Sequence, residues 1–199
     1  MSLTVSESSG FKSVPPGTYQ ARCIRLIDIG TQEGEYNGKK LSRNQVIIVW
    51  ELPTELIDDG DYAGEPYIIS KFFTASLSDR ANLRKYLETW RGKAFTPEEL
   101  KGFKLQNILD KPCMLSIIHS ETGRAKIGGV MALPKGMIVP SRINPLVSFD
   151  ITDWDANVYN SLTDGIKRLI QSSHEVQNGN NASDIKDIPV DTESDIEPF

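Results

Sequence analysis

The sequence predicts a mainly β protein, in which five strands form a small barrel with a helical insertion between the third and fourth strands and a helix near the C-terminus. Two observations support this prediction. Short runs rich in Ile, Val, Phe and Tyr recur between turn signals, which is typical of strands. The apolar spacing changes to a helical period only after the third run and again late in the chain. With 199 residues, 39% of them hydrophobic and 25% charged, we expect one globular domain with extensions.

The first two strands are predicted on either side of a polar hairpin loop. The first starts at Thr18, and its apolar positions change parity between Cys23 and Ile24, which indicates a β-bulge and a bend. Residues 28–40 are rich in glycine and charge and predict the loop, and residues 45–52 predict the second strand. Long, bent strands joined in this way suit a small barrel.

The next segment predicts a third strand followed by helices. Residues 67–74 are rich in Ile and Phe, and a helix follows that Ser78 would cap and Gly92 would end. Thr96 and the residues after it, Pro-Glu-Glu, form a capping box that begins a second helix.

The remaining elements complete the order of an OB-fold, a small open barrel that binds oligonucleotides. Two further strands are predicted at 113–119 and 124–131, and a last helix at about 155–173, which either packs on the barrel or mediates self-association. The predicted organisation is a flexible leader (1–16), an OB-fold domain that binds single-stranded DNA (17–150), a C-terminal helix (151–173) and a disordered acidic tail (174–199).

The net charge of −5 is unevenly distributed. Residues 175–199 hold seven acids and one base, so the rest of the chain carries 21 bases and 20 acids. A nearly neutral body can carry a local basic groove, so the acidic total does not exclude nucleic acid as a ligand.

Other classes of protein find little support in the sequence. No apolar stretch is long enough to span a membrane, and the N-terminus does not resemble a signal peptide, so we expect a cytoplasmic protein. Cys23 and Cys113 lie in apolar runs, which indicates buried thiols. We expect no enzyme activity, cofactor or bound metal, although a metal-dependent nuclease that uses the acids at 58–61 is an alternative.

Binding of single strands needs cations for phosphates and flat rings for bases. In the third strand Tyr67, Lys71 and Phe73 share one face, which predicts a stacking platform, the alternative being that these rings fill the barrel. Arg43 lies opposite the apolar face of the second strand, and Arg22 and Lys126 are expected to line the same groove.

The predicted hairpin tip offers one ring and two cations. Tyr36, Lys39 and Lys40 could clamp a nucleic-acid strand, the alternative being an ordinary soluble turn.

Several segments resemble phage-encoded OB-fold single-stranded DNA-binding proteins. The resemblance covers roughly residues 15–135 and rests on segments 72–77, 83–93, 95–96 and 110–113. It implies a protein without enzymatic activity that coats and protects single strands during phage DNA replication or recombination in the infected bacterial host, without strong sequence preference. An OB-fold adaptor that binds protein and not DNA is a further alternative.

The C-terminus is similar to the tails of bacterial single-stranded DNA-binding proteins, which end in acids followed by Ile-Pro-Phe. Here the last five residues are Asp195, Ile196, Glu197, Pro198 and Phe199, so Glu197 interrupts that ending. The resemblance implies that this peptide recruits host or phage replication and recombination proteins. An acidic tail can also occupy a basic groove of its own protein, so we expect deletion of 191–199 to strengthen DNA binding.

Overall fold

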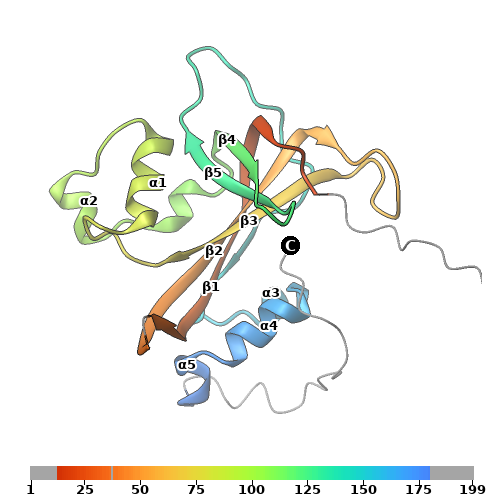
Figure 1. Cartoon of the computed structure of the whole chain (residues 1–199). Coiled ribbons are helices and arrows are strands. Elements are labelled where there is room, and N and C mark those ends of the chain that lie inside the picture. The colour runs from red at the N-terminus through yellow and green to blue at the C-terminus, as the bar shows by residue number, and fades with distance from the viewer. Residues whose placement is uncertain (1–12, 37, 180–199) are drawn as a thin grey trace, which may run out of the picture.

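A mainly β fold with a few helices is seen in the computed structural model, which describes residues 13–36 and 38–179. The strands are β1 (Gly17–Tyr36), β2 (Lys39–Leu56), β3 (Pro66–Thr74), β4 (Pro112–His119), β5 (Ala125–Met131) and β6 (Val147–Phe149). They form a six-stranded sheet in the order β3-β2-β1-β4-β5, in which neighbours are antiparallel, while β6 pairs in parallel with β1 (Figure 1). Within the described residues no backbone pairing joins β3 to β5, so the sheet is not closed.

The long first strand is bent where the sequence predicts it. The pairing of β1 with β2 shifts between Cys23 and Arg25, which leaves Ile24 as the extra residue of a bulge and confirms the predicted parity change. The third, fourth and fifth strands also lie where they are predicted, to within about one residue.

The predicted hairpin loop at 28–40 is wrong, because both strands continue through it. Glu35 pairs with Lys40 close to the turn, and Gly30, at φ 70°, lies at a second bulge instead of in a loop. A left-handed backbone suits glycine at such a bulge. Most of the polar residues expected in the loop therefore lie on two paired strands, which form a two-stranded ribbon.

One hydrophobic core lies on the inner face of the sheet, where it is covered by helix α1 (Asn82–Arg91). Trp50 of β2 and Trp90 of α1 pack with ring centroids 5.8 Å apart, and both side chains are buried. We call this cluster the inner core; its members on the strands include Ala21, Cys23, Leu26, Val46, Ile48, Trp50, Leu52, Tyr67, Ile69, Phe73, Cys113, Leu115, Ile117, Ile127 and Val130.

The helical insertion between the third and fourth strands is confirmed. It comprises α1, α2 (Pro97–Lys101) and a short 3-10 helix (Leu105–Ile108). Gly92 ends α1 in the left-handed conformation at φ 67°, and Thr96 and Glu99 form the predicted capping box of α2. Ser78 is not the cap of α1, because a turn from Ser78 to Ala81 delays the helix and Ala81 takes the N-cap position.

A second core, the outer core, lies on the other face of the sheet. It includes Ile24, Ile27, Ile29, Ile47, Val49, Phe149, Ile151, Tyr159, Leu162, Ile170 and Val176. The helices that cover it are α3 (Ala156–Ser161), α4 (Asp164–Gln171) and α5 (His174–Gln177). Figure 1 shows these helices below the long β1–β2 ribbon.

The C-terminal region differs from the single helix predicted at 155–173. Two short helices, α3 and α4, replace it, because Leu162 is extended and Thr163 is the N-cap of α4. Ser173 is the N-cap of α5, which occupies residues 174–177 of the segment predicted as a disordered tail. Strand β6, only three residues long, was not predicted. Within 13–36 and 38–179, no helix has both the length and the apolar content that a membrane span needs.

Candidate functional site

A pocket of about 450 Å³ lies where the ends of β2 and β3 meet the segment that leads into α1. Its lining consists of Arg43, Gln45, Lys71, Phe72, Phe73, Thr74, Ser76, Ser78, Arg80, Ala81 and Asn82. Three of these residues are cations, and none of the lining residues among the described part of the chain is acidic. The pocket therefore suits an anionic ligand.

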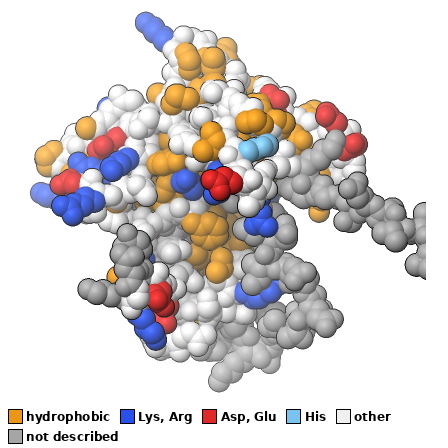
Figure 2. Space-filling view, in the orientation of Figure 1, with side chains coloured by type: hydrophobic (Ala, Val, Ile, Leu, Met, Phe, Trp, Pro, Cys, Tyr) orange, Lys and Arg blue, Asp and Glu red, His pale blue; other side chains and the backbone are white. Residues whose placement is uncertain are grey.

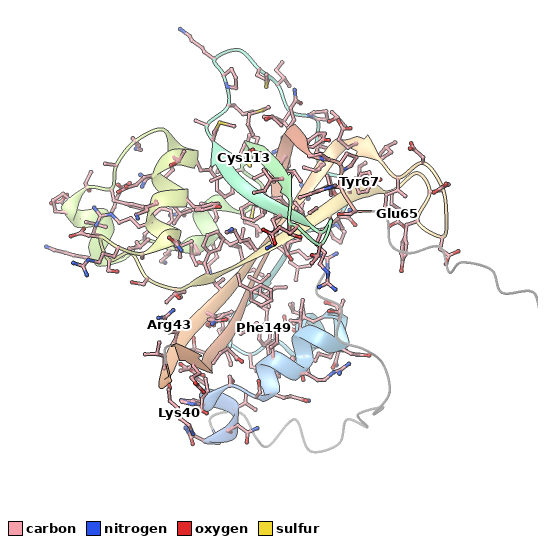
Figure 3. The ribbon with its side chains drawn as sticks, viewed as in Figure 1. Lys40, Arg43, Glu65, Tyr67, Cys113 and Phe149 are labelled. Atoms are coloured by element: carbon pink, nitrogen blue, oxygen red, sulfur yellow. The ribbon has the colours of Figure 1, made fainter. Side chains whose placement is uncertain are left out.

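The strand register places the outer-face residues of this pocket. Gln45 pairs with Thr74 and Ile47 pairs with Phe72, and because side chains alternate along a strand, Arg43 shares the outer face with them. Arg43 is exposed, and the Phe72 ring keeps 43% of its surface exposed. Figure 3 shows Arg43 on the β1–β2 ribbon, apart from the inner core in which Tyr67 lies.

Arg80 reaches the pocket from the connection between β3 and α1. Two turns shape this connection, through hydrogen bonds from Ser76 N to Thr74 O and from Ala81 N to Ser78 O. The Arg80 side chain is exposed, so the pocket is lined by two exposed arginines and an exposed ring.

Lys71 has a structural role beside its place in the pocket. Its Nζ donates to the Ile127 carbonyl at 3.2 Å and lies 5.1 Å from the centroid of the Tyr86 ring. The Tyr86 hydroxyl donates to the same carbonyl at 3.3 Å. Lys71 and Tyr86 thus tie β3 and α1 to β5, and Lys71 is only partly available to a ligand.

Two rings of the predicted stacking platform are buried. Tyr67 and Phe73 keep 7% and 3% of their surfaces exposed, and Phe73 packs edge-on against Tyr86 with ring centroids 5.0 Å apart. The alternative, that these rings fill the interior, is what the structure shows. Neither can stack on a base, because inner-face side chains of β3 point into the core.

Arg22 is also not available to a nucleic acid. Its guanidinium donates to the carbonyl of Asp110 at 2.7 Å and to those of Val139 and Pro140 at 3.2 Å each, and its side chain is only 16% exposed. The prediction that Arg22 lines a groove is therefore wrong, because the residue holds distant segments of the chain together.

The other predicted cations are more scattered. Lys40 is exposed on the ribbon opposite Glu35, and Lys126 is exposed on β5 opposite Ile118. Neither lines the pocket. The side chains of Tyr36 and Lys39 lie outside what the structure describes, as do residues 195–199 of the tail.

The exposure of the Phe72 ring is the feature of the site that alternation along the third strand did not predict. Both faces of β3 carry aromatic and aliphatic residues, so alternation alone does not show which ring is exposed. The signal lay in the partner strand, because Arg43 and Ile47 share a face and Ile47 pairs with Phe72.

For the alternative of a metal-dependent nuclease, the described residues offer no group of metal ligands. Asp58, Asp59 and Asp61 are exposed, and among the described residues no three His, Cys, Asp or Glu side chains are grouped as metal ligands would be. Cys23 and Cys113 are free and buried as predicted, and burial raises the pKa of both thiols. No family model and no curated protein matches the chain.

Proposed function

We propose that the protein is an OB-fold protein that binds single-stranded DNA at the pocket between β2, β3 and the start of α1. The observation that carries the proposal is that Arg43, Arg80 and the exposed Phe72 ring meet in one pocket without an acid in its lining. Cations for phosphates and a ring for a base are the two requirements of a single-strand site.

The fold supports this proposal. The sheet order β3-β2-β1-β4-β5 with helices between β3 and β4 is the order expected of an OB-fold. Lys71 links β3 to β5 through the Ile127 carbonyl, which brings the two edges of the open sheet close together. The pocket lies beside the second and third strands, and the OB-fold binds oligonucleotides there.

In the proposed complex, Arg43 and Arg80 contact successive phosphates and displace counterions, and a base stacks on Phe72. Neither interaction depends on base identity, so binding has little sequence preference. The protein would coat and protect single strands during phage DNA replication or recombination, in the cytoplasm of the infected bacterium. Its C-terminal peptide would recruit partner enzymes.

Fluorescence titration with oligo(dT) at low and high salt tests the proposal. Wild-type protein should bind at low salt and lose affinity steeply with added salt. The double variant Arg43→Glu, Arg80→Glu should bind at least about tenfold more weakly and show a smaller salt slope, because two phosphate contacts are lost. The matched control Lys101→Glu, Lys104→Glu makes the same change in net charge at exposed positions outside the pocket and should bind as wild type does.

Two outcomes would contradict the proposal. No binding at low salt would favour an adaptor that binds only protein. Cleavage of labelled DNA in the presence of Mg²⁺ or Mn²⁺ would favour a nuclease, whereas the proposed function requires the DNA to stay intact.

A further inference from the structure

The connection between β5 and β6, residues 132–146, presents apolar side chains to solvent. Met137, Ile138 and Ile143 keep 37%, 85% and 61% of their surfaces exposed. Figure 1 shows this loop rising above β5, and Figure 2 shows hydrophobic side chains gathered at that end of the molecule. We call residues 132–146 the apical loop.

The apical loop is held in place by two charged side chains, Arg22, which is partly buried, and Glu51, which is buried. The Arg22 guanidinium donates to the carbonyls of Val139 and Pro140, and the Glu51 carboxylate accepts from the backbone N–H groups of Ile143 and Asn144 at 2.7 Å each. Glu51 is fully buried, so these bonds offset the cost of removing its charge from water. Exposed apolar side chains on a fixed backbone are preorganised for binding.

The chemistry of the apical loop selects the kind of partner. Its charged residues are Lys135 and Arg142, and it contains no acid and no aromatic ring. A nucleic-acid site would be expected to offer rings for stacking, so the loop suits a peptide that combines acids with apolar side chains.

The chain itself carries such a peptide. Residues 191–199 contain four acids and the apolar side chains of Ile196, Pro198 and Phe199. The 11 residues from 180 to 190 join the described part of the chain to this peptide, and they span up to roughly 40 Å when extended.

We propose that the apical loop is the docking site for residues 191–199 of this chain. Ile138 and Ile143 contact the apolar side chains of the peptide, and Lys135 attracts its acids, whereas Arg142 already pairs with Asp110 at 3.4 Å. The proposal does not rest on DNA binding, and it places the tail on a surface other than the pocket of Arg43 and Arg80.

Fluorescence anisotropy with a labelled synthetic peptide of residues 191–199 tests the proposal. The receptor is the chain without residues 191–199, which keeps every residue that the structure describes. Ile138→Asp with Ile143→Asp should weaken peptide binding at least about tenfold, and Lys135→Glu should weaken it and reduce its salt dependence. The control Ile118→Asp, at another exposed isoleucine, should have no effect.

The proposal would be overturned if the peptide did not bind, or if it bound the double variant Ile138→Asp with Ile143→Asp as well as wild type. It would also be overturned if the double variant Arg43→Glu with Arg80→Glu lost binding instead. The last result would place the tail in the pocket. The chain that keeps residues 191–199 should bind the labelled peptide at least about fivefold more weakly than the shortened chain, because its own tail competes at high effective concentration. Equal binding by the uncut and shortened chains would also contradict docking within the chain.

Discussion

Phe72 and Phe73 are neighbours on β3, yet they lie on opposite faces of the sheet in different environments. Phe73 is 3% exposed and packs against Tyr86 in the inner core, whereas Phe72 is 43% exposed beside Arg43. The inner face of β3 is closed by α1, but the outer face is left open at this point. One strand therefore contributes a ring to the inner core on one face and leaves a ring exposed at the candidate site on the other.

The same contrast appears along the outer face itself. Ile27 of β1 and Ile47 of β2 are paired neighbours that are 0% and 2% exposed under the C-terminal helices. Phe72 is the next residue across the sheet and is largely uncovered. The outer core thus extends over the middle strands and to Ile68 on β3 but leaves Phe72 uncovered, so the candidate site begins where the outer core ends.

The largest expected effect comes from the inner face. Phe73→Ala should destabilise the protein by about 3–5 kcal/mol, because it removes a buried ring and leaves a cavity beside Tyr86. Urea denaturation measures the free energy of unfolding. At a temperature where the variant is folded, it should lose less oligo(dT) affinity than Phe72→Ala, because Phe73 lines the pocket but is only 3% exposed. A stable Phe73→Ala variant that fails to bind DNA would reverse the roles assigned to the two faces.

Glu51 and Arg43 are both on the outer face of β2, yet only Arg43 is exposed. Glu51→Ala should cost about 2–3 kcal/mol, because the N–H groups of Ile143 and Asn144 lose their acceptor. Hydrogen exchange of the apical loop should speed up in the same variant, and the control Glu55→Ala should show neither change. Unchanged exchange would mean that Glu51 does not fix the loop.

A smaller effect is expected at Phe72, and it falls mainly on DNA binding. Phe72→Ala should weaken oligo(dT) binding by about 1–3 kcal/mol through loss of one base stack. Its unfolding free energy should change by less than in Phe73→Ala, because a partly exposed ring buries less apolar surface. Phe72→Trp should retain the affinity. If the alanine variant binds as wild type does, base stacking at this ring is refuted.

The sequence predicted the elements whose signals are local. The bulge near Cys23 follows from a parity change, the Gly92 cap from its position after an amphipathic helix, and the exposed face of Arg43 from alternation within β2. Each of these signals lies within a few residues of the feature it specifies.

The features that the sequence did not predict depend on contacts between residues far apart in the chain. Arg22 bonds to residues 88 and 118 positions away, and Glu51 to residues 92 and 93 positions away, so neither partner could be inferred from local pattern. Phe72 and Phe73 could not be ranked because both faces of β3 are apolar, each being next to its own core. Alternation shows which residues share a face but not which face stays open.

The smallest effect is expected for Glu175. Through this residue α5, one of the helices that cover the outer core, contacts β1. This carboxylate accepts from the Thr31 N–H at 2.7 Å and from its hydroxyl at 2.6 Å. Partial burial raises the pKa of Glu175, but these hydrogen bonds and nearby His174 outweigh it and hold the pKa below its ordinary value of 4.5. Asp28 behaves in the opposite way, since burial and the neighbouring carboxylates of Asp150 and Glu175 raise its pKa.

The sign of the pH dependence follows from these two shifts. A lowered pKa contributes stability above pH 4.5 that is lost as the pH falls through the pKa of the folded state, whereas the raised pKa of Asp28 favours the folded state as the pH falls. Glu175→Gln removes the first contribution and keeps the part of the second that comes from the burial of Asp28 and from Asp150. Urea midpoints between pH 5 and pH 3 should therefore fall less with pH in the variant than in wild type, by less than about 1 kcal/mol for a carboxylate this close to solvent. Equal pH dependence in the two proteins would show that Glu175 does not secure α5. The helical cover would then depend on the outer core and on the other polar contacts with β1, such as those of Gln32 with Leu169 and of Glu33 with His174.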